Sequence, residues 1–112
     1  MSVKKSDIQI EVVLDDNQNP SLIKWEAMDG ATPIKQESKG MFLAFFDKES
    51  KETFKIDLWT TDMQVGEMDR FMFHTLKSLS ETYYKATQNT ELSNHMKSFV
   101  QHFGEFTKII PK

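Results

Sequence analysis

The period of the apolar residues changes once along this chain, and that change constrains the fold more than any other feature. Up to Trp59, apolar residues alternate with polar ones, as in half-buried β-strands. From Met68 onward they recur every three or four residues, as in amphipathic α-helices. The change takes place within residues 56–68, where Thr61 or Asp62 can cap a first helical turn. We therefore expect a sheet followed by helices.

Strands are expected over about residues 6–14, 21–28 and 36–46, with a fourth that ends near Thr60. The turns between them are too short for helical crossovers, which favours an antiparallel four-stranded meander. The third strand differs from the others, because Met41–Phe46 is apolar on both faces. Such a run fits either a central strand shielded within the monomer or a face that meets another subunit or a partner.

Two helices are expected after the strands, one over 65–87 and one from Asn89 or Thr90 to Pro111. Their short connection predicts an antiparallel helical hairpin packed on one face of the sheet, which gives an α+β fold of order ββββαα. The chain of 112 residues is long enough for a single domain, with the sheet in 1–60 and the hairpin in 61–112. An apolar stripe on the first helix is interpreted as core: Met68, Met72, Leu76, Leu79 and Tyr83. Phe71, Phe73 and Tyr84 widen it beyond what one contact with a sheet needs, so one of them could serve an interface.

Composition excludes several classes of protein. The net charge of −3, with dispersed cations, argues against a nucleic-acid binder. The absence of cysteine excludes a disulfide framework, a thiolate nucleophile and a cysteine-based zinc site. No window is apolar enough to span a membrane, and no apolar run follows Lys4-Lys5, so we expect no membrane insertion and a cytoplasmic location.

Histidines and carboxylates form two candidate chemical sites. Glu91, His95 and His102 share one face of the second helix and could hold a metal. Ser98 and Glu105 continue that face, which makes it a solvated polar face in our interpretation. No metal and no cofactor are expected.

The second candidate site is at the junction of strand and helix. Asp57 and Asp62 flank it and could form an acid–base pair, although such residues more often cap a helix or pair with a cation. No nucleophile elbow and no glycine-rich phosphate loop occur in the sequence. We therefore assign no catalytic residue and expect that the protein is not an enzyme.

The junction also carries a recognisable set of residues, with matching positions upstream at Pro20, Ile23, Trp25, Ala27 and Asp47. At the junction these are Ile56–Thr60, Asp62-Met63, Val65, Glu67-Met68, Phe71 and Thr75-Leu76. This pattern resembles the gliding motility protein GldC family of Bacteroidota over roughly residues 5–106. Gly66 departs from it, where the family pattern leads us to expect a capping Asp or Asn.

The resemblance implies a small, soluble accessory protein with no catalytic residue to transfer. We therefore expect a non-enzymatic, cytoplasmic protein that acts on gliding or secretion components through protein–protein contacts. The alternative is a holdase or export chaperone that binds unfolded clients, because the order of elements is similar to that of the chaperone SecB.

An interaction surface is expected on the outer face of the sheet and beside it. Its residues are Phe42, Phe46, Trp59, Asp62 and Phe71, with Met41 and Phe45 in place of Phe42 and Phe46 if the strand phase differs by one residue. The same sheet face is a candidate for homo-oligomerisation.

Overall fold

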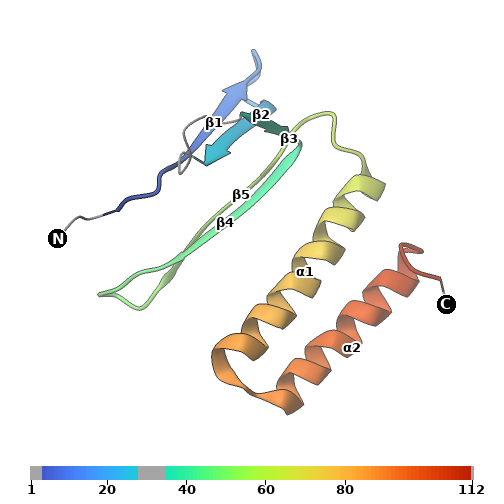
Figure 1. Ribbon diagram of the computed structural model, residues 1–112. Helices are drawn as coiled ribbons and strands as arrows, with labels where there is room; N and C mark the ends of the chain where they lie inside the picture. Colours follow the sequence, from blue (N-terminus) through green and yellow to red (C-terminus); the bar gives the residue numbers. More distant parts are fainter. Residues whose placement is uncertain (1–3, 28–34, 112) are drawn as a thin grey trace. The chain divides into compact units, whose positions relative to one another are not determined.

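The computed structural model describes residues 4–27 and 35–111, and the chain divides into two compact units, 1–63 and 64–112. Among the described residues, the first unit contains five strands and the second contains two helices (Figure 1), which confirms the α+β class. The strands are β1 Ile8–Leu14, β2 Pro20–Ala27, β3 Gln36–Ser38, β4 Gly40–Phe46 and β5 Thr53–Trp59; the helices are α1 Val65–Thr87 and α2 Thr90–Phe106. The turn expected around Asp29-Gly30 lies outside the described residues.

The expectation of one four-stranded meander is wrong, because the third strand is interrupted at Lys39. Its first part, β3, pairs with β2, and its second part, β4, pairs with β5. The result is a three-stranded sheet β1-β2-β3 and a two-stranded sheet β4-β5. Backbone bonds at the interruption explain the change: the Thr60 N–H donates to the Lys39 carbonyl (2.7 Å) and the Thr61 N–H donates to the Pro20 carbonyl (3.0 Å). The end of β5 therefore meets the start of β2, and each pairs with a different part of the third strand.

The loop between β4 and β5 contains the six residues 47–52, so it is longer than a two-residue turn. The Asp47 carboxylate closes it by accepting hydrogen bonds from the backbone N–H of Ser50 (2.8 Å) and Glu49 (3.2 Å). These bonds, led by the one from Ser50, lower the pKa of Asp47. Lys51 adopts a positive φ of 63° within the loop. The two strands are thus joined by a turn with its own hydrogen-bond network.

Helix α1 has the predicted bounds but a different cap. Gln64 precedes the helix, and its backbone N–H donates to the carboxylate of Glu67 (3.0 Å). The expected cap at Thr61 or Asp62 is therefore wrong. Gly66 lies inside the first turn and does not occupy the capping position.

Helix α2 is capped by Asn89, one of the two predicted residues, whose side chain accepts from the Leu92 N–H (3.0 Å). The helix ends at Phe106 and does not continue to Pro111. The Gly104 carbonyl accepts from the N–H groups of both Ile109 (2.9 Å) and Ile110 (3.1 Å). The chain after α2 therefore folds back on the last helical turn.

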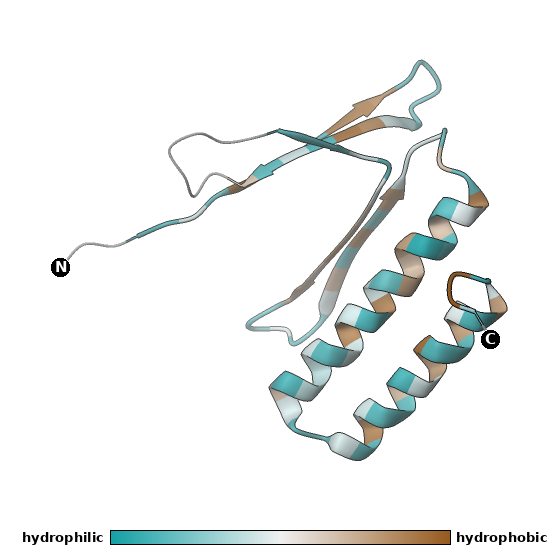
Figure 2. Cartoon of the chain, turned by 45° about the vertical axis from the view of Figure 1, so that its right-hand side comes forward, coloured by the Kyte–Doolittle hydropathy of each residue, from teal (hydrophilic) through white to brown (hydrophobic). Residues whose placement is uncertain are grey.

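The seam between the two helices is built mainly from small side chains. Phe73 and Ser80 are buried on α1, and Ser93, Val100 and Gly104 are buried on α2. A Cβ at Gly104 would lie 2.6 Å from the Phe73 ring, so the helices approach closely there. The hydropathy colouring shows apolar and polar residues interleaved along both helices (Figure 2). The seam thus differs from the predicted stripe, in which Phe73 was a flanking residue and Leu79, now 53% exposed, was central.

Candidate interaction surface

The β4–β5 hairpin has one face without a polar side chain. The strands pair in the register Met41↔Leu58, Leu43↔Ile56 and Phe45↔Phe54, and directly opposite residues of an antiparallel pair point to the same side. These six side chains, which we call the apolar face, are Met41, Leu43, Phe45, Phe54, Ile56 and Leu58.

The apolar face is open to solvent toward the hairpin loop. Phe45, Phe54 and Ile56 are between 51% and 59% exposed, whereas Met41, Leu43 and Leu58 are half-buried. A two-stranded hairpin is at best marginally stable in water unless its apolar side is covered. A contiguous exposed patch of this kind is characteristic of a protein-binding surface. The hairpin therefore presents the strongest candidate surface of the first unit.

The opposite face of the hairpin, which we call the mixed face, combines apolar and charged side chains. It contains Phe42, Ala44, Phe46, Thr53, Lys55, Asp57 and Trp59. The predicted residues Phe42, Phe46 and Trp59 therefore do share one face, with Phe46 69% and Trp59 56% exposed. Lys55 and Asp57 form an ion pair on it, with Nζ and Oδ2 3.1 Å apart. This face offers apolar contact together with fixed charge.

The sequence predicts some residues of the apolar face and not others. The alternation predicts that Phe54, Ile56 and Leu58 share a side, and the register confirms this. Met41 and Phe45 belong to the alternative strand phase considered above. The predicted interaction surface did not include Phe54, Ile56 or Leu58. The signal that could have identified the face is its complete lack of polar residues on both strands.

Asp62 has a structural role at the end of the first unit. Its carboxylate accepts a hydrogen bond from the Thr60 hydroxyl (2.6 Å), and its other oxygen lies 4.0 Å from the Lys39 ammonium. The Thr60 bond, followed by the charge of Lys39, lowers the pKa of Asp62. Thr60 itself is 2% exposed and also contacts the Lys39 carbonyl, so this cluster ties the end of β5 to the interruption between β3 and β4.

Phe71 belongs to the other unit. It is half-buried on α1, and its carbonyl accepts a hydrogen bond from the Thr75 hydroxyl (2.7 Å). Its assignment to an interaction surface stays a prediction.

The candidate acid–base pair is not brought together in one hollow. Asp57 lines a hollow with Asn19, Pro20 and Trp59, whereas Asp62 lines a different one with Thr60. Each carboxylate also has its own cation, Lys55 for Asp57 and Lys39 for Asp62, as noted above. The arrangement is that of structural ion pairs.

The candidate metal ligands are spread along α2. Glu91, His95 and His102 are all exposed, and the His102 ring lies against Phe106, with ring centroids 5.9 Å apart. Within residues 4–27 and 35–111, no group of three or more His, Cys, Asp or Glu side chains is placed to hold a metal ion. The described part of the chain also contains no helix of the length and apolarity that a bilayer crossing requires.

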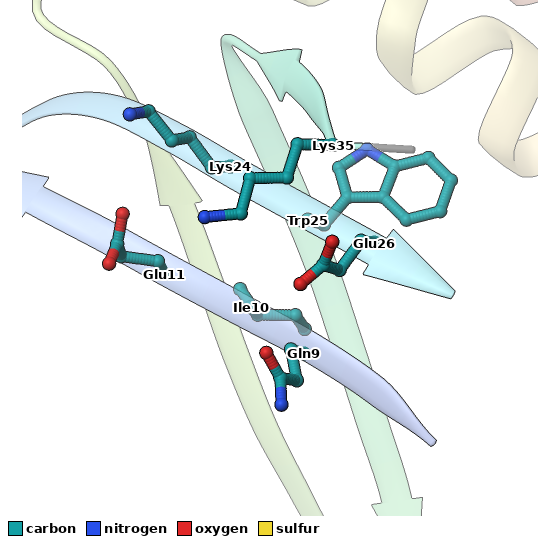
Figure 3. A pocket seen from close by; sticks show the side chains of 7 residues that line it. All are labelled: Gln9, Ile10, Glu11, Lys24, Trp25, Glu26 and Lys35. Carbon is teal, nitrogen blue, oxygen red and sulfur yellow. The ribbon is translucent and has the colours of Figure 1, made fainter. Parts of the chain in front are cut away.

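A shallow hollow of about 350 Å³ lies on the three-stranded sheet (Figure 3). Its lining places the carboxylates of Glu11 and Glu26 among the ammonium groups of Lys24 and Lys35, beside Trp25. Trp25 is held by a hydrogen bond from its indole N–H to the Ser38 hydroxyl (3.1 Å). Because two carboxylates and two ammonium groups line the hollow, it favours neither anions nor cations.

Comparison with known proteins identifies one family. The family model described as "Gliding motility-associated protein GldC-like" matches residues 20–109, which include all of β2 to α2. No curated protein and no solved structure gives a significant match. The matched range covers the candidate surface and both helices. The chain therefore belongs to the GldC-like family of gliding motility-associated proteins.

Proposed function

We propose that this protein is a non-enzymatic accessory component of bacterial gliding motility, and that it binds a protein partner through the apolar face of the β4–β5 hairpin. The observation that carries the proposal is this face itself, six apolar side chains without a polar residue on a hairpin whose outermost aromatics are more than half exposed. Family membership supplies the biological setting. The partner belongs to the gliding or secretion machinery and is reached in the cytoplasm.

Aromatic side chains explain why this face suits a protein partner. Phe45 and Phe54 are opposite each other in the register, so two aromatic side chains lie at the exposed end of the face. Aromatic residues carry large apolar areas, and in most interfaces a small number of such anchors supplies most of the binding energy. Ile56 continues the pair along β5. The exposed end of the hairpin is therefore the expected centre of the contact.

Two adjacent phenylalanines provide a matched test of the surface. Phe45 is on the apolar face and Phe46 on the mixed face, and both are more than half exposed. We expect Phe45→Glu to weaken partner capture at least about tenfold, because it buries a charge at the contact, and to reduce colony spreading. Phe46→Glu should leave both close to wild type. The measurement is quantitative affinity capture and spreading in a gliding bacterium that lacks its own GldC-like gene.

The result separates three possibilities. Loss with Phe45→Glu alone supports the apolar face. Loss with Phe46→Glu alone would transfer the contact to the mixed face that contains Phe42 and Trp59. Capture of many unrelated unfolded proteins, with no stoichiometric partner and with normal spreading, would contradict the accessory role in favour of a holdase.

A further inference from the structure

The outer edge of β5 has free backbone groups within the described part of the chain. β5 pairs on one side with β4 and lies at the edge of its two-stranded sheet. Opposite residues of an antiparallel pair alternate between those that bond to the partner strand and those whose N–H and C=O point away. The bonds Thr60 N–H to Lys39 and Asp47 N–H to Glu52, at the two ends of the hairpin, continue its register. The backbone N–H and C=O groups of the even-numbered residues of β5 therefore point toward β4. Those of the odd-numbered residues point away from β4, to the outer edge.

The residues of β5 whose backbone groups point to the outer edge include both members of the ion pair, Lys55 and Asp57. They lie symmetrically on either side of Ile56, the central residue of the strand. An antiparallel pairing of two β5 strands about Ile56 would place each Lys55 directly opposite Asp57 of the other copy. In the same pairing Phe54 would be opposite Leu58 of the other copy. Charges would complement each other on one face while the apolar faces became continuous.

From this symmetry we infer that two copies of the chain associate edge to edge through β5, in antiparallel register centred on Ile56. Each copy contributes the outward backbone N–H and C=O groups of Lys55 and Asp57. Across the two-fold axis, Lys55 of each copy then exchanges backbone hydrogen bonds with Asp57 of the other copy. The two apolar faces then form one continuous surface, with twice as many side chains as the apolar face of a single copy. This inference goes beyond the proposed function, because self-pairing requires no other partner.

Other registers of two β5 strands are less favourable. Moving the centre by one residue places Lys55 opposite Lys55 or Asp57 opposite Asp57, and like charges directly opposite each other destabilise a strand pair. Moving it by two residues separates Lys55 from Asp57 altogether. A lysine on an edge strand ordinarily discourages pairing, because its charge would be left without a partner. Lys55 already pairs with Asp57 of its own chain, and in the register centred on Ile56 it gains Asp57 of the other copy as a second partner.

The remaining strands lack this property. β2 also contains a cation and an anion two residues apart, Lys24 and Glu26, but it is paired on both sides. β1 carries Glu11 at its centre and no cation, so symmetric pairing would oppose two carboxylates. β3 carries Glu37 and no cation, and β4 carries no charge at all. Charge complementarity under two-fold symmetry at a free edge therefore distinguishes β5 among the described strands.

Cysteine cross-linking tests the register directly, since the natural chain has no cysteine. Ile56→Cys places the thiols of the two copies at the two-fold axis, in a non-hydrogen-bonded pair whose Cα separation of about 4.5 Å suits a disulfide. Phe54→Cys and Leu58→Cys are matched controls on the same face, whose thiols would be several residues apart. We expect mild oxidation to give a covalent dimer with Ile56→Cys and little with either control. Efficient cross-linking of either control would overturn the register, as would failure of Ile56→Cys.

Charge exchange tests the same pairing without a covalent bond. Lys55→Asp should raise the dimer dissociation constant about tenfold, because two attractive pairs become repulsive. The double variant Lys55→Asp, Asp57→Lys should return it close to wild type, which also controls for folding. Sedimentation velocity over a concentration series measures both. A wild-type chain that is monomeric at millimolar concentration, or a double variant as weak as the single one, would refute the inference. Phe45→Glu, on β4, should still dimerise, so the two proposals fail separately.

Discussion

Ser93 is a buried side chain that lacks a hydrogen-bond partner at the seam of the helical hairpin. It is fully buried, and its hydroxyl oxygen has no bond, whereas the buried hydroxyl of Ser80 donates to the Lys77 carbonyl (2.7 Å). A buried polar group without a partner costs free energy, and alanine is the better helix former. These two serines therefore differ in what their hydroxyl groups contribute to stability.

We expect Ser93→Ala to raise the free energy of unfolding by about 1 kcal/mol, because it removes an unsatisfied hydroxyl. Ser80→Ala, the matched control, should gain less because it also loses a hydrogen bond. Urea denaturation of the full chain measures both changes. The interpretation fails if Ser93→Ala does not stabilise the chain more than Ser80→Ala does.

Asp62 gives a prediction about pH. The hydrogen bond from Thr60 favours the ionised carboxylate, so the pKa of Asp62 in the folded chain is below the ordinary value of 3.8. The resulting stabilisation is present above that ordinary value and is lost as the pH falls through the lowered pKa. Thr60→Val removes the donor, so the pKa of Asp62 should rise toward 3.8 and acid destabilisation should begin at a higher pH.

Carboxyl ¹³C chemical shifts followed through an acid titration measure the Asp62 pKa directly. Asp47 is the internal control, because Ser50 and not Thr60 lowers its pKa. An unchanged Asp62 pKa in Thr60→Val would show that the hydroxyl bond is not the cause of the shift.

At the scale of the element, two glycines of the helical hairpin should respond to alanine in opposite directions. Gly104 lies against Phe73 and Ile110, and an added Cβ would come within 2.6–2.9 Å of their side chains. Gly66 has no neighbouring atom within 4 Å of an added Cβ. Gly104→Ala should therefore destabilise the chain by about 1–3 kcal/mol through overpacking.

Gly66→Ala should instead stabilise the chain by up to about 1 kcal/mol, through helix propensity alone. Thermal and urea unfolding of both variants give the comparison. Equal effects of the two substitutions would mean that the close approach at Gly104 does not limit the packing of the hairpin.

The helices and strands themselves were largely predictable, and the exceptions arise from contacts that a local sequence pattern does not report. The bounds of α1 and the Asn89 cap of α2 follow from periodicity and from the capping preference of asparagine. The third strand is interrupted at Lys39 because Thr60 bonds to its carbonyl from 21 residues further along the chain, and no local pattern reports such a contact. Likewise, Asp62 pairs with Thr60 and Lys39 and does not cap α1.

The candidate surface was predictable to a lesser extent. Alternation assigns Phe54, Ile56 and Leu58 to one side of β5, but it does not tell which side of the hairpin stays exposed. Exposure depends on what covers each face, and that is a property of packing between elements. Phe42, Phe46 and Trp59 therefore share one face as expected, while Phe54, Ile56 and Leu58 on the opposite face were not included in the predicted surface.

At the scale of the whole molecule, one hairpin carries two proposed contact sites, the apolar face and the outer edge of β5. A partner would cover the apolar face, and a second copy would extend it across the two-fold axis. Phe45→Glu tests the first contact and Lys55→Asp tests the second, so each contact can be lost without the other. A chain that fails both tests would leave only its family membership as evidence for a role in gliding.

The sequence alone determined the α+β class, the point where strands give way to helices, the bounds of α1 and the resemblance to the GldC family. These depend on residue type and on spacing within one element, which a single chain displays directly. Tertiary structure alone decided the break at Lys39, the small-residue seam around Gly104 and the register that turns the backbone groups of Lys55 and Asp57 toward the free edge of β5. Each of these depends on contacts between segments far apart in sequence, where hydrogen bonds and close packing select one pairing among several that the local pattern allows.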